Sequence, residues 1–189
     1  NLDKEYRGNN PEKIDWGFDE DYTFSIPIET VKADPTLRNK VRNNSSIIRY
    51  VKYNGIRILF AGDLETAGWE WLAKNNEFFK SLMKGGLDVL VAPHHGHDSG
   101  FPKALLDLTG NVKAIVLSKD SEATKEGTDV YTGYSNYADG VRYYNTNDKN
   151  MYFGKVLTTR SNGNVYLFVD PQYGFYVATE TASPNHKKI

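Results

Sequence analysis

The chain has 189 residues, with 23 Lys and Arg against 24 Asp and Glu, so its formal net charge is -1. This length suffices for one domain with a hydrophobic core, and the charge balance excludes overall attraction to a polyanion. The absence of cysteine excludes disulfides, thiolate zinc sites and thiol catalysis. No apolar run approaches the roughly 20 residues of a membrane helix, and no signal peptide opens the chain. Because it starts on Asn, we expect a piece of a longer polypeptide; the compartment stays open, with the cytoplasm favoured.

The first 44 residues are polar and highly charged. Alternating apolar and polar residues predict a strand at Tyr22–Ile28. Pro27 either makes it an edge strand or ends it, because proline cannot donate a backbone hydrogen bond. Dense charge in residues 29–44 predicts an exposed loop with one helical turn after Pro35. Residues 1–44 are therefore expected to be a polar arm or loop with one edge strand.

Residues 45–118 alternate between strand and helix patterns. Asn54-Gly55 between two apolar runs is a strong hairpin signal, and four apolar residues at three- and four-residue steps predict one long helix that ends at Gly85-Gly86. The order β, α, β, α, β argues for a layered α/β sheet with sites at the carboxyl ends of its strands. The predicted strands are Ser45–Tyr53, Ile56–Ala61, Leu87–Ala92 and Lys113–Ser118, and the predicted helices are Thr66–Lys84 and Pro102–Leu108.

The last third of the chain is predicted to close the fold. Tyrosine spacing suggests a helix at Asn136–Tyr144. Three later runs, Val156–Thr159, Val165–Asp170 and Tyr173–Thr179, read as a meander of strands. The domain is therefore expected to span residues 45–180, followed by a frayed tail at 181–189.

Three of the four histidines lie within four positions, at the end of the apolar run that starts at Leu87. A run of this kind reads as a strand buried on both faces, so its end is a rigid edge. His94, His95 and His97 on such an edge, with glycines beside them that let backbone come close, are typical of a metal or phosphate site. A lone histidine here would be read as a surface residue, but three together favour a site.

Asp63 follows the preceding strand, and one helix separates it from the histidine strand. Parallel neighbours end at the same sheet edge, so Asp63 is expected to lie near His94 and His95. A carboxylate with imidazoles can hold a divalent metal. Read alone, Asp63 could instead cap the following helix; the neighbouring histidines favour the metal.

Two motifs together resemble a known family: ILFAGDLE at 58–65 and DVLVAPHHGH at 88–97. Their order and spacing resemble the second half of a metallo-β-lactamase-fold hydrolase, closest to the bacterial DNA-uptake competence proteins. The resemblance implies a metallo-β-lactamase-like αββα sandwich, of which this chain looks like the carboxyl half. It covers residues 43–118 well and continues loosely over 156–169.

The resemblance also implies a two-metal site, with zinc usual and manganese or iron possible. Asp63 matches the bridging aspartate and His95 a metal ligand, whereas His94 would face substrate or a supporting residue. His97 stands where the family has serine and is a candidate additional ligand. We therefore take Asp63 and His94 as candidate catalytic residues and Asp63, His95 and His97 as candidate metal ligands. A hydroxide made available by the metals would attack a phosphorus or carbonyl centre.

The chain departs from the family in its ligands. The HxHxDH motif that precedes GD in the family is absent. Residues 95–100 are superficially similar to it, and we interpret this similarity as coincidence. The resemblance also implies a histidine in a YGHP-like turn, which this chain replaces around Tyr131–Tyr137. We therefore expect the missing amino-terminal half, or a partner chain such as a second copy, to complete the site.

The sequence predicts a metal-dependent hydrolase, most plausibly a phosphodiesterase or nuclease. The alternative is a metal-free, catalytically inactive interaction or scaffold module derived from the same fold. A weaker third reading is a non-catalytic α/β domain whose histidines bind an anion.

Overall fold

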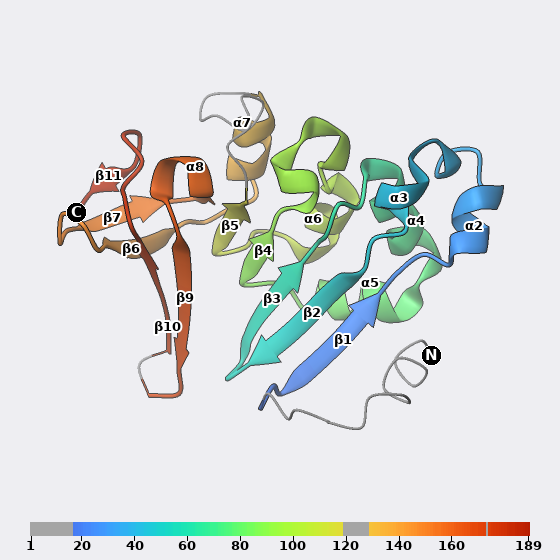
Figure 1. Ribbon diagram of the computed structural model, residues 1–189. Coiled ribbons are helices and arrows are strands. Elements are labelled where there is room, and N and C mark those ends of the chain that lie inside the picture. Colours follow the sequence, from blue (N-terminus) through green and yellow to red (C-terminus); the bar gives the residue numbers. More distant parts are fainter. Residues whose placement is uncertain (1–16, 119–128, 173) are drawn as a thin grey trace, which may run out of the picture.

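The computed structural model describes residues 17–118, 129–172 and 174–189. Within them the chain forms two mixed β-sheets and a set of helices (Figure 1). The mixed α/β class predicted from the sequence is therefore confirmed. The metallo-β-lactamase-like sandwich stays a prediction. No helix in the described ranges combines the length and the apolar character needed to cross a membrane.

The larger sheet carries the predicted hairpin and a run of parallel strands. β1 to β3 are antiparallel, and β3, β4, β5 and β8 are parallel. Asn54 and Gly55 both adopt positive φ, +48° and +77°, in the hairpin turn, as a turn of this length requires. In order across the sheet, the strands are β1 (Glu20–Phe24), β2 (Ile48–Tyr53), β3 (Ile56–Phe60), β4 (Val89–Val91), β5 (Ala114–Leu117) and β8 (Val156–Thr158).

The smaller sheet packs against the larger one through its β9–β10 hairpin. Leu167 and Phe175 of the hairpin contact a buried cluster that includes Val89 and Val116 of the larger sheet. β6 and β10 are parallel and the other pairs antiparallel. In order, the strands are β11 (Lys187–Lys188), β7 (Met151–Gly154), β6 (Val141–Asn145), β10 (Gly174–Thr179) and β9 (Val165–Asp170).

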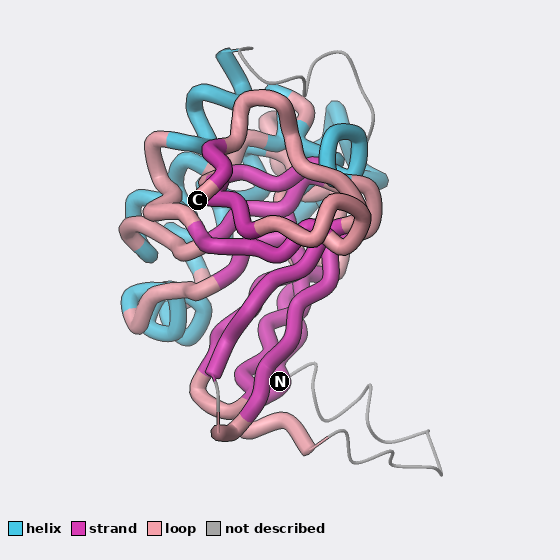
Figure 2. The backbone as a smooth tube through the Cα atoms, turned by 90° about the vertical axis from the view of Figure 1, so that its left-hand side faces the viewer, coloured by secondary structure: helices cyan, strands magenta, loops and turns pink. Residues whose placement is uncertain are grey.

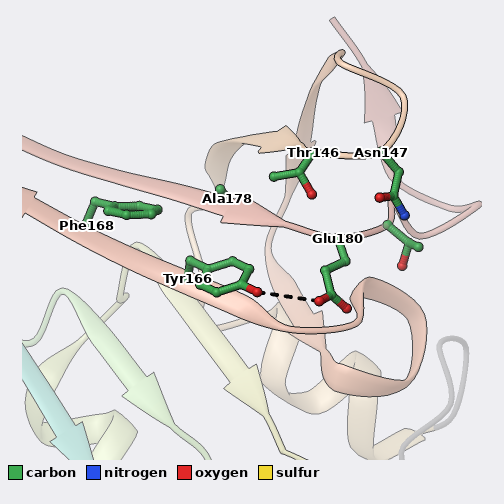
Figure 3. A pocket seen from close by; sticks show the side chains of 7 residues that line it. Thr146, Asn147, Tyr166, Phe168, Ala178 and Glu180 are labelled. Carbon is green, nitrogen blue, oxygen red and sulfur yellow. Dashed lines mark hydrogen bonds between the residues drawn. The ribbon is translucent and has the colours of Figure 1, made fainter.

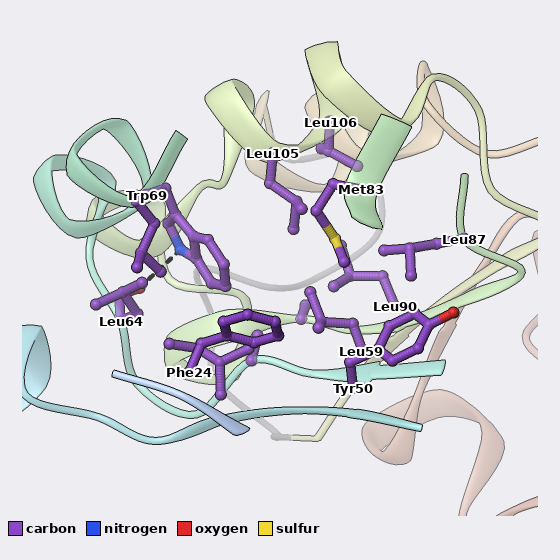
Figure 4. Close-up of a cluster of buried hydrophobic side chains, with 14 of the residues drawn as sticks. Phe24, Tyr50, Leu59, Leu64, Trp69, Met83, Leu87, Leu90, Leu105 and Leu106 are labelled. Atoms are coloured by element: carbon purple, nitrogen blue, oxygen red, sulfur yellow. Dashed lines mark hydrogen bonds between the residues drawn. The ribbon is translucent and has the colours of Figure 1, made fainter. Parts of the chain in front are cut away.

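Helices cover the opposite face of the larger sheet, so its central strands are buried on both faces (Figures 1 and 2). Trp69 is fully buried there and its indole N–H donates to the carbonyl of Leu64 at 3.1 Å (Figure 4). The helical segments are α2 (Ile28–Ala33), η1 (Arg38–Lys40), α3 (Val41–Asn44), α4 (Thr66–Asn75), α5 (Glu77–Lys84), η2 (Pro93–Gly96), η3 (Asp98–Gly100), α6 (Lys103–Thr109), α7 (Asp129–Ser135) and α8 (Thr159–Asn162).

The helical turn predicted after Pro35 is present, as η1 and α3. The rest of the predicted exposed loop at 29–44 is wrong, because α2 forms there and Val31 and Leu37 enter the main core. Two apolar side chains are enough to anchor this otherwise charged stretch. The edge strand is confirmed, shifted to β1. The part of the predicted arm at residues 1–16 lies outside the described residues.

The predicted helix Thr66–Lys84 is two helices, α4 and α5, separated by Asn76. Asn76 adopts extended backbone angles, and its side chain accepts a hydrogen bond from the N–H of Phe79 at 2.9 Å. It thus caps α5, a role that Asn performs well. The apolar residues that predicted the helix do face the core, since Trp69, Leu72 and Phe79 are buried.

The carboxyl third also differs from its prediction. Asn136–Tyr144 is not a helix: β6 starts at Val141, whose two-residue alternation with Tyr143 and Asn145 buries one face. β8 joins the larger sheet beside β5, so the predicted meander reduces to the hairpin of β9 and β10. Tyr173, where the last strand was predicted to begin, lies outside the described residues.

The tail at 181–189 was expected to be frayed, and this is wrong. Lys187 and Lys188 pair with β7 as strand β11, and the imidazole Nδ1 of His186 lies 2.7 Å from the buried Tyr143 hydroxyl. Backbone pairing and one buried polar contact hold the tail. The described parts of both predicted flanking segments, 17–44 and 181–189, therefore pack with the domain.

Asp88 ties the start of β4 to both neighbouring strands. Its carboxylate, 5% exposed, accepts from the Arg57 backbone N–H at 2.9 Å and from the Lys113 ammonium at 3.0 Å. Burial raises the pKa of Asp88, but hydrogen bonds from Arg57 and Lys113 outweigh it, so the pKa lies below its usual value of 3.8.

Asp88→Asn is expected to lower the free energy of unfolding by on the order of 2 kcal/mol at pH 7, because charge-assisted bonds are lost. A lowered folded-state pKa gives stability that is present above the unfolded pKa and is lost as pH falls through the folded pKa. The difference from wild type should therefore shrink below about pH 3.8. Urea unfolding of both proteins at pH 7 and pH 3 measures this difference in the free energy of unfolding. The exposed Glu77→Gln is the control, and a difference independent of pH would contradict the assignment.

Candidate functional site

The candidate site lies at the edge of the larger sheet where β3, β4 and β5 end. Their parallel register, Phe60 opposite Val91 and Val91 opposite Val116, brings the residues that follow them to one edge. The backbone N–H of His94 donates to the carbonyl of Gly62 at 2.9 Å. The GD turn after β3 and the histidine turn after β4 are thus joined directly, as the sequence predicted.

The histidine turn is strained. His94 and His95 both adopt positive φ, +47° and +55°, a conformation that costs a non-glycine residue on the order of 1 kcal/mol or more. Gly100 packs beneath the turn: a Cβ atom there would come within 2.7 Å of the His94 Cβ. Strain of this kind persists only where surrounding contacts enforce it, and it concentrates at functional sites.

Asp63 and His95 form the first contact pair. The Asp63 Oδ1 atom lies 3.6 Å from the His95 Nε2 atom, and both side chains are nearly half exposed. The other ring nitrogen of His95, Nδ1, lies 3.2 Å from the carbonyl oxygen of Ser118, at the end of β5. The Ser46 hydroxyl accepts from the Asp63 backbone N–H at 3.2 Å. Four chain segments therefore meet at this pair.

The alternative role of Asp63, capping the next helix, is not what the structure shows. The N-cap of α4 is Glu65, and no side chain makes a capping hydrogen bond there. The Asp63 carboxylate instead faces His95.

His94 belongs to a second group, on the other side of the turn. Its Nδ1 atom lies 3.1 Å from the Ser99 hydroxyl and 3.8 Å from Glu65 Oε1. Glu65 is buried and also accepts from the side-chain amide of Asn43 at 2.8 Å. The prediction that His94 and His95 face different partners agrees with these contacts.

His97 does not join the Asp63–His95 pair in any contact described. Its Nδ1 atom lies 2.6 Å from Asp98 Oδ1 and 3.2 Å from the Ser99 hydroxyl. Over residues 17–118, 129–172 and 174–189, no group of three or more His, Asp and Glu side chains is placed to hold a metal ion. The predicted set of Asp63, His95 and His97 is therefore not assembled within this part of the chain.

The Asp63–His95 pair fits part of a metal site. Because a carbonyl oxygen only accepts, the contact with Ser118 places the proton of a neutral His95 on Nδ1 and leaves a lone pair on Nε2. That lone pair and the Asp63 carboxylate then face each other at 3.6 Å, an arrangement that a cation between them would stabilise. Metal-ligating histidines are commonly oriented by such a second hydrogen bond. Structural and catalytic zinc sites use three or four protein ligands, so this pair supplies only part of one.

Tyr131 and Tyr137, in the region where the family has a histidine, contact other groups. The Tyr131 hydroxyl donates to the Val156 carbonyl at 3.1 Å and the Tyr137 hydroxyl to Asp107 at 2.9 Å. Neither of these two contacts involves Asp63 or the histidine turn.

Sequence reasoning missed Glu65, Ser99 and Ser118. Glu65 lies two residues after Asp63 in GDLE, but outside any regular strand, where a two-residue spacing does not place side chains on one side. Ser118 acts through its backbone carbonyl, which no residue type reveals. Ser99 is recognisable only once the turn that folds it back onto His94 is known.

Comparison with protein-family models and with curated protein sequences found no match to this chain.

The contact with Ser118 predicts the tautomer of His95. In its neutral form, the ring should carry its proton on Nδ1. Long-range ¹H–¹⁵N correlation spectra distinguish the two tautomers. Ser118→Ala is the control: it removes the hydroxyl, which lies 3.5 Å from His95 Nδ1, and keeps the carbonyl, so the spectrum should not change. A proton on Nε2 would contradict the contact.

Proposed function

We propose that this chain forms part of a metal-dependent hydrolase of the metallo-β-lactamase type, acting on phosphodiester bonds. The observation that carries the proposal is the Asp63–His95 pair, whose two acceptor atoms face each other at 3.6 Å at the edge of the larger sheet. The sequence resemblance around GD and HHG supports it, because the two paired residues are the ones that match the family's metal-binding positions.

Different residues of this chain would hold the metal and orient its ligands. Asp63 and His95 would hold the metal, and the Ser118 carbonyl would keep the His95 ring in the orientation that exposes Nε2. A bound divalent metal would polarise the phosphoryl group and lower the pKa of water.

His94 would sit beside the reacting group and pass protons. The buried Glu65 carboxylate lies 3.8 Å from its Nδ1 atom. The Ser99 hydroxyl would hold the ring in place.

A further segment is needed to complete the ligand set. Ile47 and Phe60, which lie next to the candidate site along the chain, are 57% and 43% exposed, and large apolar side chains beside a site commonly mark a surface that another element covers. We propose that the missing amino-terminal half, or a second copy of the chain, covers them and supplies the remaining ligands. Zinc is the expected metal.

A second candidate is a metal-free scaffold module. It is favoured by one observation: no group of three metal-binding side chains is placed together among the described residues. On this alternative, Asp63 and His95 would keep only a structural role.

The hydrolase proposal predicts turnover of bis(4-nitrophenyl) phosphate in the presence of Zn²⁺ or Mn²⁺ by an assembly that holds the full ligand set, either this chain with its amino-terminal half or a dimer of the chain. Asp63→Ala and His95→Ala should each lower the rate by roughly 100-fold or more, since even residues that only support a metal ligand are worth 10- to 100-fold. His186→Ala is the matched control, because His186 lies beside Tyr143 in the smaller sheet, and should keep wild-type activity.

Absence of turnover by both assemblies in the presence of both metals, or equal rates in all four proteins, would contradict the hydrolase proposal. Absence of turnover from a chain that still folds would favour the scaffold.

A further inference from the structure

The outer face of the smaller sheet is unusually rich in exposed aromatic side chains. In β6, β7, β9 and β10, alternate residues point away from the larger sheet, and the strand registers place them in two rows. One row runs Met151, Tyr144, Ala178, Tyr166, and the other consists of the two pairs Phe153–Arg142 and Tyr176–Phe168. Six of these eight side chains are large apolar or aromatic groups at least 37% exposed.

A hollow of about 460 Å³ opens in this face (Figure 3). Ala178, the one small residue of the two rows, lines it together with Tyr166 and Phe168. Thr146, Asn147, Glu180 and Thr181 complete the lining. Its volume falls within the range of roughly 300–1,000 Å³ typical of small-molecule sites.

The aromatic side of the hollow is held in place. Phe168 stacks on Tyr176 with ring centroids 4.8 Å apart and planes at 10°, and Tyr166 lies beside Phe168 at 6.4 Å and 28°. The Tyr166 hydroxyl points at Glu180, 3.5 Å from Oε1. The rings therefore form a ladder whose end at Tyr166 is fixed by a polar contact, and little ordering remains to be done when a ligand binds.

The polar side of the hollow offers both donors and acceptors. The Glu180 carboxylate accepts from the Asn164 backbone N–H at 3.1 Å and from the Asn164 side-chain amide at 2.8 Å, which orients it. Asn147 adds an amide, and Thr146 a hydroxyl. The lining contains no lysine or arginine.

We propose that this hollow binds a neutral saccharide of one or two pyranose rings. The apolar C–H face of a pyranose packs on an aromatic ring, whose face carries partial negative charge. Its hydroxyls both donate and accept, which matches a carboxylate, an amide and a threonine together. This binding site goes beyond the proposed hydrolase function, because its residues belong to the smaller sheet and not to the histidine turn.

The charge of the lining decides against a nucleic acid. Aromatic ladders also stack bases, but single-strand binding combines stacking with cations that neutralise phosphates. Here a carboxylate occupies the polar end and would repel a phosphate.

Saturation-transfer NMR with cellobiose, N,N′-diacetylchitobiose and maltose tests the proposal. At least one disaccharide should receive saturation at its ring C–H protons. Tyr166→Ala and Glu180→Gln should each weaken its binding by at least about tenfold. Phe153→Ala is the matched control: it removes an exposed aromatic ring from the same face but outside the hollow, and binding should persist.

Glu180→Gln keeps the shape of the side chain, so the test survives if Tyr166→Ala fails to fold. No transfer to any of the three disaccharides would overturn the proposal, as would transfer that neither variant weakens. Variant-sensitive binding of a thymidine hexanucleotide or of tetramethylammonium, with none of the disaccharides, would also overturn it and assign the hollow to a base or to a cation.

Discussion

The structure depends on the parallel pairing of β3, β4 and β5. Each of these strands is short, and helices on one side and the smaller sheet on the other bury the central ones. Because the side-chain period in a strand is two, burial of both faces fixes the register. That register places Asp63, His95 and the Ser118 carbonyl at one edge. The candidate site is thus a consequence of how the core packs, and no mobile loop is needed to assemble it.

At the same edge, His94 and His95 adopt unfavourable backbone angles. Two consecutive histidines at positive φ are held by the hydrogen bond from His94 to Gly62 and by the space left at Gly100. The turn separates two neighbouring imidazoles, so that His95 faces Asp63 and His94 faces Glu65 and Ser99. A regular continuation of the strand would also send them to opposite faces, but the tight turn keeps both at the edge.

The features predicted correctly from the sequence are those that depend on the local residue pattern and on the order of the strands. The hairpin at Asn54-Gly55, the strands of the histidine edge and the meeting of Asp63 with His95 all followed from that pattern and order. Helix α2 was missed because two buried side chains, Val31 and Leu37, outweigh many charged neighbours. The break at Asn76 and the placement of β8 beside β5 depend on tertiary packing, which periodicity does not encode. Glu65 and Ser99 became visible only with the turn that brings them to His94.

The central claim is that Asp63 and His95 act together as metal ligands. Native mass spectrometry with Zn²⁺, on the untagged chain as a dimer or together with its amino-terminal half, tests it most directly. We predict one zinc ion bound to wild type and to His186→Ala, and a loss of that ion in both Asp63→Ala and His95→Ala. Zinc binding that survives either substitution, or the absence of binding in wild type, would contradict the claim.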